Sequence, residues 1–241
     1  MFDRFLEFFA NGYINVIIAL VVAYLLGSLN FSIMITRIVN KGEDIRSMGS
    51  GNAGFTNVLR SVGKGPAIAT IVLDFAKGVG ATIIGSILFS QVPVEGVLPA
   101  ELGSYGAYIC GFIAIVGHML PIFFNFKGGK GVVCAAALTA VVDINVFITI
   151  VIAFVIVIAI TKIVSISSLI AATVFPISTF FSSYFFKYLP SQSTSTPYSL
   201  VYVIVATSFA LFVCIFIFVK HKDNIKRLKD GTEKKITAKK K

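Results

Sequence analysis

Seven apolar stretches restrict the folds open to this chain more than any other feature. A membrane-spanning helix needs about 20 mostly apolar residues. Apolar residues make up 56% of the sequence and charged residues 13%, whereas soluble domains average about 45–50% and 25%. We therefore predict an all-α membrane protein with about seven transmembrane helices, forming a single domain over residues 1–241. The stretches lie at about 14–38, 66–89, 103–122, 131–142, 146–161, 164–186 and 199–219.

The fourth stretch has only about a dozen residues, which is short for a crossing. It is either a tilted half-helix or one arm of a hairpin that turns at Asp143–Asn145. If the fourth and fifth stretches do not both cross, the count falls to five. The sequence has no visible internal repeat, so a duplicated transporter architecture gains no support.

Positive charge is concentrated on one side of this topology. With the N-terminus outside, 18 Lys and Arg residues lie inside or close to it and two, Arg4 and Lys187, lie outside. Ten of the 18 belong to the tail Lys220–Lys241. Cytoplasmic segments are enriched in Lys and Arg, so we expect an external N-terminus and a cytoplasmic C-terminus. We interpret the tail as facing anionic membrane lipid and not nucleic acid.

A polar, glycine-rich loop, Asp44–Gly65, separates the first two stretches. Glycines allow several backbone N–H groups to point at one spot, and hydroxyl, amide and guanidinium groups add donors. This combination suits an anion, most plausibly a phosphate, although a flexible solvated loop is the alternative. The loop has no Gly-x4-Gly-Lys-Ser/Thr motif, which disfavours nucleotide hydrolysis. The candidate residues are Ser50, Gly51, Asn52, Gly54, Thr56 and Arg60.

Two lysines on a glycine turn form a second candidate anion site. Lys127 and Lys130 belong to Phe126–Gly131, just after the third stretch. Of the two, Lys127 is the preferred phosphate ligand. A flexible, positively charged loop is the alternative.

Further polar residues fall at the same predicted membrane face. Ser165, Ser167 and Ser168 begin the sixth stretch and could instead cap its helix. His221 and Asn224 are three residues apart, so they share one face where the last helix leaves the membrane. Residues beyond about Gly231 are expected to be dispensable for catalysis, apart from any folding role of Glu233.

Ionisable residues inside the apolar stretches need partners. Asp74 and Lys77 are three residues apart, and mutual neutralisation is the simplest interpretation. His118 alone is more often a structural histidine than a ligand. The cysteines Cys110, Cys134 and Cys214 have no metal-site spacing, and we expect neither a metal nor another cofactor.

In this order, the motifs resemble those of the bacterial acyl-phosphate-dependent glycerol-3-phosphate acyltransferase family over nearly the whole chain. They are Gly27-Ser28, Asp44-Ile45-Arg46, Gly49–Asn57 with Arg60, Gly63-Lys64, Asp74-x-x-Lys77-Gly78, Gly117–Gly131, the serines at 165–168, and His221–Leu228 with Gly231 and Glu233.

The resemblance implies acyl transfer from acyl phosphate to the sn-1 hydroxyl of glycerol 3-phosphate, giving lysophosphatidate and phosphate. It implies an enzyme of the bacterial inner membrane with a cytoplasmic active site, and we expect no obligate protein partner. The implied catalytic residues are Ser50, Asn52, Thr56, Arg60, His221 and Asn224. The implied phosphate ligands are Gly51, Gly54, Lys127, Lys130, Ser165 and Ser168, with Asp74, Lys77, His118 and Glu233 as structural neighbours.

Two other classes compete with this interpretation. A carrier for a phosphorylated metabolite would also use a cationic loop, but it should show polar groups at midplane in two halves. A non-catalytic membrane scaffold would leave the glycine-rich loop unexplained. The sequence has no His-x4-Asp motif and no clear Ser-His-Asp set, so we expect no covalent nucleophile.

Overall fold

A computed structural model of the chain describes residues 2–194 and 197–236, and this part is helical without any β-strand. The prediction of an all-α membrane protein is confirmed. Six helical segments are long and apolar enough to cross a membrane: Leu6–Val39, Lys64–Ser90, Pro99–Phe124, Ile144–Thr161, Val164–Ser191 and Leu200–Lys220. The principal helices are α1 (Phe2–Ser28), α2 (Phe31–Val39), α3 (Phe55–Ser61), α4 (Lys64–Ser90), α5 (Pro99–Met119), α6 (Val132–Val142), α7 (Ile144–Thr161), α8 (Val164–Phe181), α10 (Leu200–Lys220) and α11 (Lys222–Lys229).

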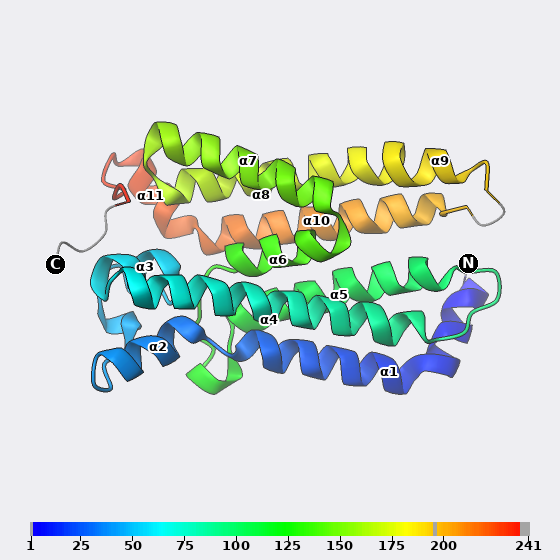
Figure 1. Cartoon of the computed structure of the whole chain (residues 1–241), viewed down its shortest axis with the longest axis horizontal. Helices are drawn as coiled ribbons and strands as arrows, with labels where there is room; N and C mark the ends of the chain where they lie inside the picture. Colours follow the sequence, from blue (N-terminus) through cyan, green and yellow to red (C-terminus); the bar gives the residue numbers. More distant parts are fainter. Residues whose placement is uncertain (1, 195–196, 237–241) are drawn as a thin grey trace.

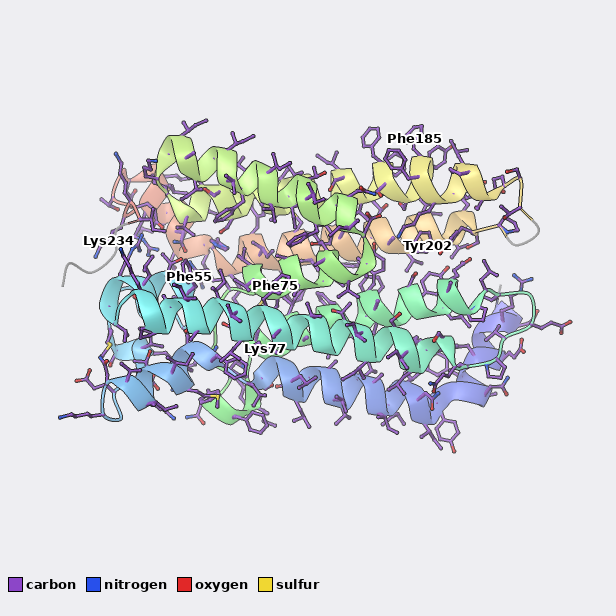
Figure 2. The ribbon with its side chains drawn as sticks, in the orientation of Figure 1. Phe55, Phe75, Lys77, Phe185, Tyr202 and Lys234 are labelled. Atoms are coloured by element: carbon purple, nitrogen blue, oxygen red, sulfur yellow. The ribbon has the colours of Figure 1, made fainter. Side chains whose placement is uncertain are left out.

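The long helices run side by side along the longest axis of the molecule (Figure 1). α1, α4 and α5 form one group, α7, α8 and α10 form another, and α6 lies between them. Large apolar side chains cover the outside, as a lipid environment allows. Phe185, for example, is 46% exposed and points away from the bundle (Figure 2).

Glycines let α1, α4 and α5 approach one another closely. A Cβ atom on Gly85 of α4 would lie 2.3 Å from the Gly106 carbonyl of α5, and one on Gly106 would lie 2.2 Å from the Gly85 carbonyl. Small residues at contacts are typical of membrane helices, because packing replaces the hydrophobic effect between helices in lipid.

The first stretch contains a break that the sequence did not predict. α1 ends at Ser28, and the Asn30 side chain accepts a 3.2 Å hydrogen bond from the Ile33 N–H, which caps α2. From α4, the buried Lys77 donates to the carbonyls of Gly27 and Leu29 at this junction. Lys77 therefore satisfies carbonyls that the helix break leaves open.

α6 and α7 form the hairpin that was one of the two alternatives for the fourth stretch. α6 has 11 residues, about 17 Å of helix, which is short of a hydrocarbon layer of about 30 Å. Asp143 turns the chain by accepting hydrogen bonds from the N–H groups of Asn145 and Val146. Its other oxygen accepts from Ser182 at 2.6 Å and lies 3.5 Å from the Lys187 ammonium. Ser182 and Lys187 belong to the π-helical segment Ser182–Tyr188 that continues α8.

The two ends of the bundle differ in their connections. α2, α3 and α11 gather at one end, here called the site end, together with the C-terminal segment (Figure 1). The N-terminus and the α4–α5 connection lie at the opposite end. All the predicted polar loops thus lie at the site end.

Candidate active site

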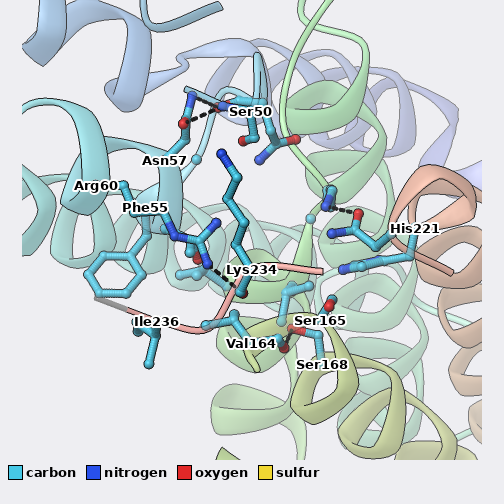
Figure 3. Close-up of a pocket in the computed structure, with 18 of the residues that line it drawn as sticks. Ser50, Phe55, Asn57, Arg60, Val164, Ser165, Ser168, His221, Lys234 and Ile236 are labelled. Atoms are coloured by element: carbon cyan, nitrogen blue, oxygen red, sulfur yellow. Dashed lines mark hydrogen bonds between the residues drawn. The ribbon is translucent and has the colours of Figure 1, made fainter. Parts of the chain in front are cut away.

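A cavity of about 470 Å³ opens at the site end between α3, α4, α6, α7, α8 and α11 (Figure 3). Segments far apart in the sequence supply its walls. The predicted site residues that line it are Ser50, Asn52, Gly54, Thr56, Arg60, Asp74, His118, Lys130, Ser165, Ser168, His221, Asn224 and Glu233. Gly51, Lys77 and Lys127 were also predicted but do not line it.

Asn57 holds the glycine-rich loop in its folded form. Its amide nitrogen donates to the carbonyls of Ile45, Met48 and Asn52 at 3.0–3.1 Å. Its amide oxygen accepts a 2.9 Å hydrogen bond from the Ser50 N–H. One buried side chain thus contacts four backbone groups. The sequence did not predict this structural role of Asn57, because an asparagine in a glycine-rich loop can equally be a ligand.

A charged cluster ties this loop to the Phe126–Gly131 turn. Asp44 pairs with Arg37 at 2.9 Å and with Arg46 at 2.8 Å, and the hydrogen bonds from Arg46 lower the pKa of Asp44 to about 2. Arg46 also donates to the carbonyls of Phe124 and Lys127. Lys127 therefore contributes its backbone to this junction, while its side chain is exposed.

Lys130 is the lysine of the turn that reaches the cavity. Its ammonium group donates to the Asn224 side-chain oxygen. Burial lowers the pKa of Lys130 to about 8. Of the two lysines of the turn, Lys130 is therefore the one that faces the cavity.

Asp74, Lys77 and His118 form a buried cluster between α4 and α5. The Lys77 ammonium lies 2.9 Å from Asp74 and 3.0 Å from His118 Nδ1. Because an ammonium only donates, Nδ1 accepts in this contact. Asp74 and His118 border the cavity, and Lys77 supports them from behind.

Glu233 connects three elements at the cavity. It accepts hydrogen bonds from Ser165 at 2.8 Å, from Asn224 at 2.6 Å and from Arg227 at 2.6 Å. Burial alone would raise the pKa of Glu233, but these hydrogen bonds lower it overall. Ser165 thus binds Glu233 and does not cap α8, whose N-cap is Ile163. Ser168 donates to Val164 within the same helix.

His221 presents its imidazole to the cavity (Figure 3). Its Nδ1 lies 2.8 Å from the Ile217 carbonyl, which can only accept, so Nδ1 carries the proton. Burial and the Lys130 cation lower the pKa of His221 to about 4. At neutral pH the ring is uncharged, and Nε2 is an acceptor.

Together, these features define a helical membrane protein with a polar cavity at one end, lined by Arg60, Lys130 and His221 among others. The family model described as glycerol-3-phosphate acyltransferase matches residues 17–231. A glycerol-3-phosphate acyltransferase of Brucella canis is 34% identical over 230 residues, covering 95% of this chain and 98% of the relative. One of Mesorhizobium japonicum is 34% identical, covering 93% and 98%.

Solved structures of PlsY, an integral membrane glycerol 3-phosphate acyltransferase, have the same fold. Its glycerol 3-phosphate form is 28% identical with a TM-score of 0.74, covering 92% of this chain and 95% of that one. Its lysophosphatidic acid form is 29% identical with a TM-score of 0.70, covering 91% and 94%. The chain belongs to the glycerol-3-phosphate acyltransferase family, and it is a multi-pass membrane acyltransferase.

Proposed function

We propose that the protein transfers an acyl group from acyl phosphate to the sn-1 hydroxyl of glycerol 3-phosphate, releasing lysophosphatidate and phosphate. The observation that supports this best is the composition of one cavity. Arg60, Lys130, Ser50 and Asn52 supply cationic and hydrogen-bonding groups. Apolar side chains in the same wall suit an acyl chain: Ile71, Val132, Val133, Phe154 and Ile158.

The acyl phosphate is already activated, so the reaction requires no covalent nucleophile from the protein. The sn-1 oxygen bonds to the acyl carbon while the bond from that carbon to the phosphate oxygen breaks. The departing phosphate takes the hydroxyl proton. His221 Nε2 accepts a hydrogen bond from the second hydroxyl of glycerol 3-phosphate and so orients the sn-1 hydroxyl, while Arg60 and Lys130 stabilise the negative charge.

The topology proposal places this cavity at the cytoplasmic face of a bacterial inner membrane. α2, α3 and α11, which lie at the site end, and the loop between α2 and α3 contain many of the basic residues, including Lys41, Arg46 and Arg227, and such residues favour the cytoplasmic side. We infer an external N-terminus and one catalytic domain that acts without an obligate protein partner.

The test is to incubate purified protein with acyl phosphate and labelled glycerol 3-phosphate, in the absence of coenzyme A and acyl carrier protein. Formation of labelled lysophosphatidate is expected. A matched reaction contains acyl coenzyme A in place of acyl phosphate. Equal or faster turnover with acyl coenzyme A would refute the assignment of the donor.

A further inference from the structure

The C-terminal segment Thr232–Ile236 is part of the cavity wall. Glu233, Lys234 and Ile236 all line the cavity, although the sequence suggested that residues beyond Gly231 are dispensable. The segment has no regular secondary structure, so specific contacts hold it in place.

These contacts lie on both sides of Lys234. Before it, Glu233 is held by Ser165, Asn224 and Arg227. After it, the Ile236 N–H donates to the Lys162 carbonyl at 2.7 Å. The backbone at Lys234 is therefore fixed between two attachment points, and its side chain has a defined direction.

Arg60 fastens the same segment from the opposite wall. Its Nη2 donates to the Lys234 carbonyl at 2.9 Å and to the Lys235 carbonyl at 3.1 Å. The Nε of Arg60 is buried and has no hydrogen-bond partner among the described residues. Arg60 thus holds the segment with Nη2, while its Nη1 makes no hydrogen bond within residues 2–194 and 197–236.

The Lys234 side chain extends across the cavity toward the loop that contains Ser50 and Asn57 (Figure 3). Within residues 2–194 and 197–236, its ammonium group makes no hydrogen bond or ion pair. A cation that lines an anion site without a protein partner is suited to bind a ligand. Arg60 and Lys130 flank the same space.

We propose that Lys234 is a substrate-binding residue, whose ammonium group binds the phosphate of glycerol 3-phosphate or of the acyl donor. The docked segment brings this third cation to Arg60 and Lys130. The proposal rests on the proposed function for the identity of the donor, but phosphate is common to both substrates.

The test compares full-length wild type, Lys234→Ala, Lys234→Arg and the control Lys229→Ala. Lys229 is an exposed residue of α11 that does not line the cavity. Lys229→Ala changes the net charge of the protein by the same amount as Lys234→Ala. The apparent KM of each substrate and kcat are measured, together with the rise in Tm caused by glycerol 3-phosphate and by inorganic phosphate.

Lys234→Ala should raise the KM of one substrate about tenfold or more, since a hydrogen bond to a charged group is lost. Its kcat should change much less, Lys234→Arg should restore most of the affinity, and Lys229→Ala should match wild type. The substrate whose KM rises identifies the phosphate that Lys234 binds.

Unchanged KM values and phosphate-induced Tm shifts in Lys234→Ala would overturn the proposal, as would an equal effect of Lys229→Ala. If wild type fails to use acyl phosphate, the donor assignment is wrong. The Tm measurements need no donor and still test Lys234, with a smaller phosphate-induced shift in Lys234→Ala expected.

Discussion

The Nδ1 atom of His221 lies 2.8 Å from the carbonyl oxygen of Ile217, one turn earlier in the chain. This hydrogen bond fixes the tautomer, because the carbonyl requires a donor. The second ring nitrogen is then an acceptor at the cavity. In this neutral tautomer His221 does not donate a hydrogen bond from Nε2 to a phosphate.

His221→Ala should lower kcat/KM roughly 10²-fold, as expected when a group that positions a reacting atom is lost. The pKa of His221 is lowered to about 4, so the neutral ring persists above that pH and is lost only below it. The ratio of wild-type to His221→Ala kcat/KM should therefore stay constant between about pH 5.5 and 7. The titration of the substrate cancels in this ratio. A tenfold decrease of the ratio toward pH 5.5 would show that the ring titrates normally.

The loss of the Lys130 charge should produce the alkaline limb of the pH profile of kcat/KM. The pKa of Lys130 is lowered to about 8, so the cation is present below this pH and is lost as the pH rises through it. Wild-type kcat/KM should decrease about tenfold between pH 7 and 9. Lys130→Arg stays charged and should remove this limb, even if its activity is lower. An identical limb in Lys130→Arg would assign it to another group.

Arg60→Lys should lower kcat/KM by an order of magnitude or more. Nη2 of Arg60 donates to the carbonyls of Lys234 and Lys235, which leaves Nη1 of the planar guanidinium for an anion, whereas one ammonium group cannot reproduce this geometry. Arg4→Lys, at the opposite end of the bundle, is the control. Wild-type kinetics in Arg60→Lys would exclude Arg60 from the site.

Gly49→Ala should be more harmful than Gly54→Ala. Gly49 has a φ of +57°, and an added Cβ would lie 2.3 Å from the Asn57 side-chain oxygen. Gly54 has an extended backbone, with the Asn52 side chain 3.1 Å from an added Cβ. Gly49→Ala should decrease kcat/KM at least tenfold by displacing Asn57. Gly54→Ala should mainly raise the KM for glycerol 3-phosphate, by a few fold. The reverse order would show that Asn57 does not control the loop.

The sequence predicted the helices well where a long apolar run ends in a polar loop. The α4 stretch was expected at 66–89 and observed at Lys64–Ser90. The break after Ser28 was missed, because Gly27 to Phe31 contains no proline or charge that marks an end. The junction depends on Lys77, which is 48 residues away from Leu29.

The site was predictable as a set of segments, but the individual contacts were not. In the sequence, Lys127 and Lys130 flank the same pair of glycines, and nothing distinguishes one from the other. Left-handed backbone at Asn125, Phe126 and Gly131 sets their directions, and only Lys130 reaches the cavity. Likewise, the sequence of the tail is typical of a solvated basic segment. Only the structure shows that Glu233 accepts hydrogen bonds from Ser165, Asn224 and Arg227.

Asp74 and Lys77 should be coupled in stability. Both are buried, and their charged groups lie 2.9 Å apart. Lys77 also donates hydrogen bonds to the carbonyls of Gly27 and Leu29. Lys77→Met removes the nearest cation from a buried carboxylate, whose remaining neighbour is His118 at 3.6 Å, and breaking a buried pair costs about 3–5 kcal/mol. The measurement is the Tm of purified protein in detergent, because activity would also report the place of Asp74 in the cavity wall. Asp74→Asn combined with Lys77→Met should be more stable than Lys77→Met alone, since the buried charge is gone. Purely additive losses in the double variant would show that the two charges do not stabilise each other.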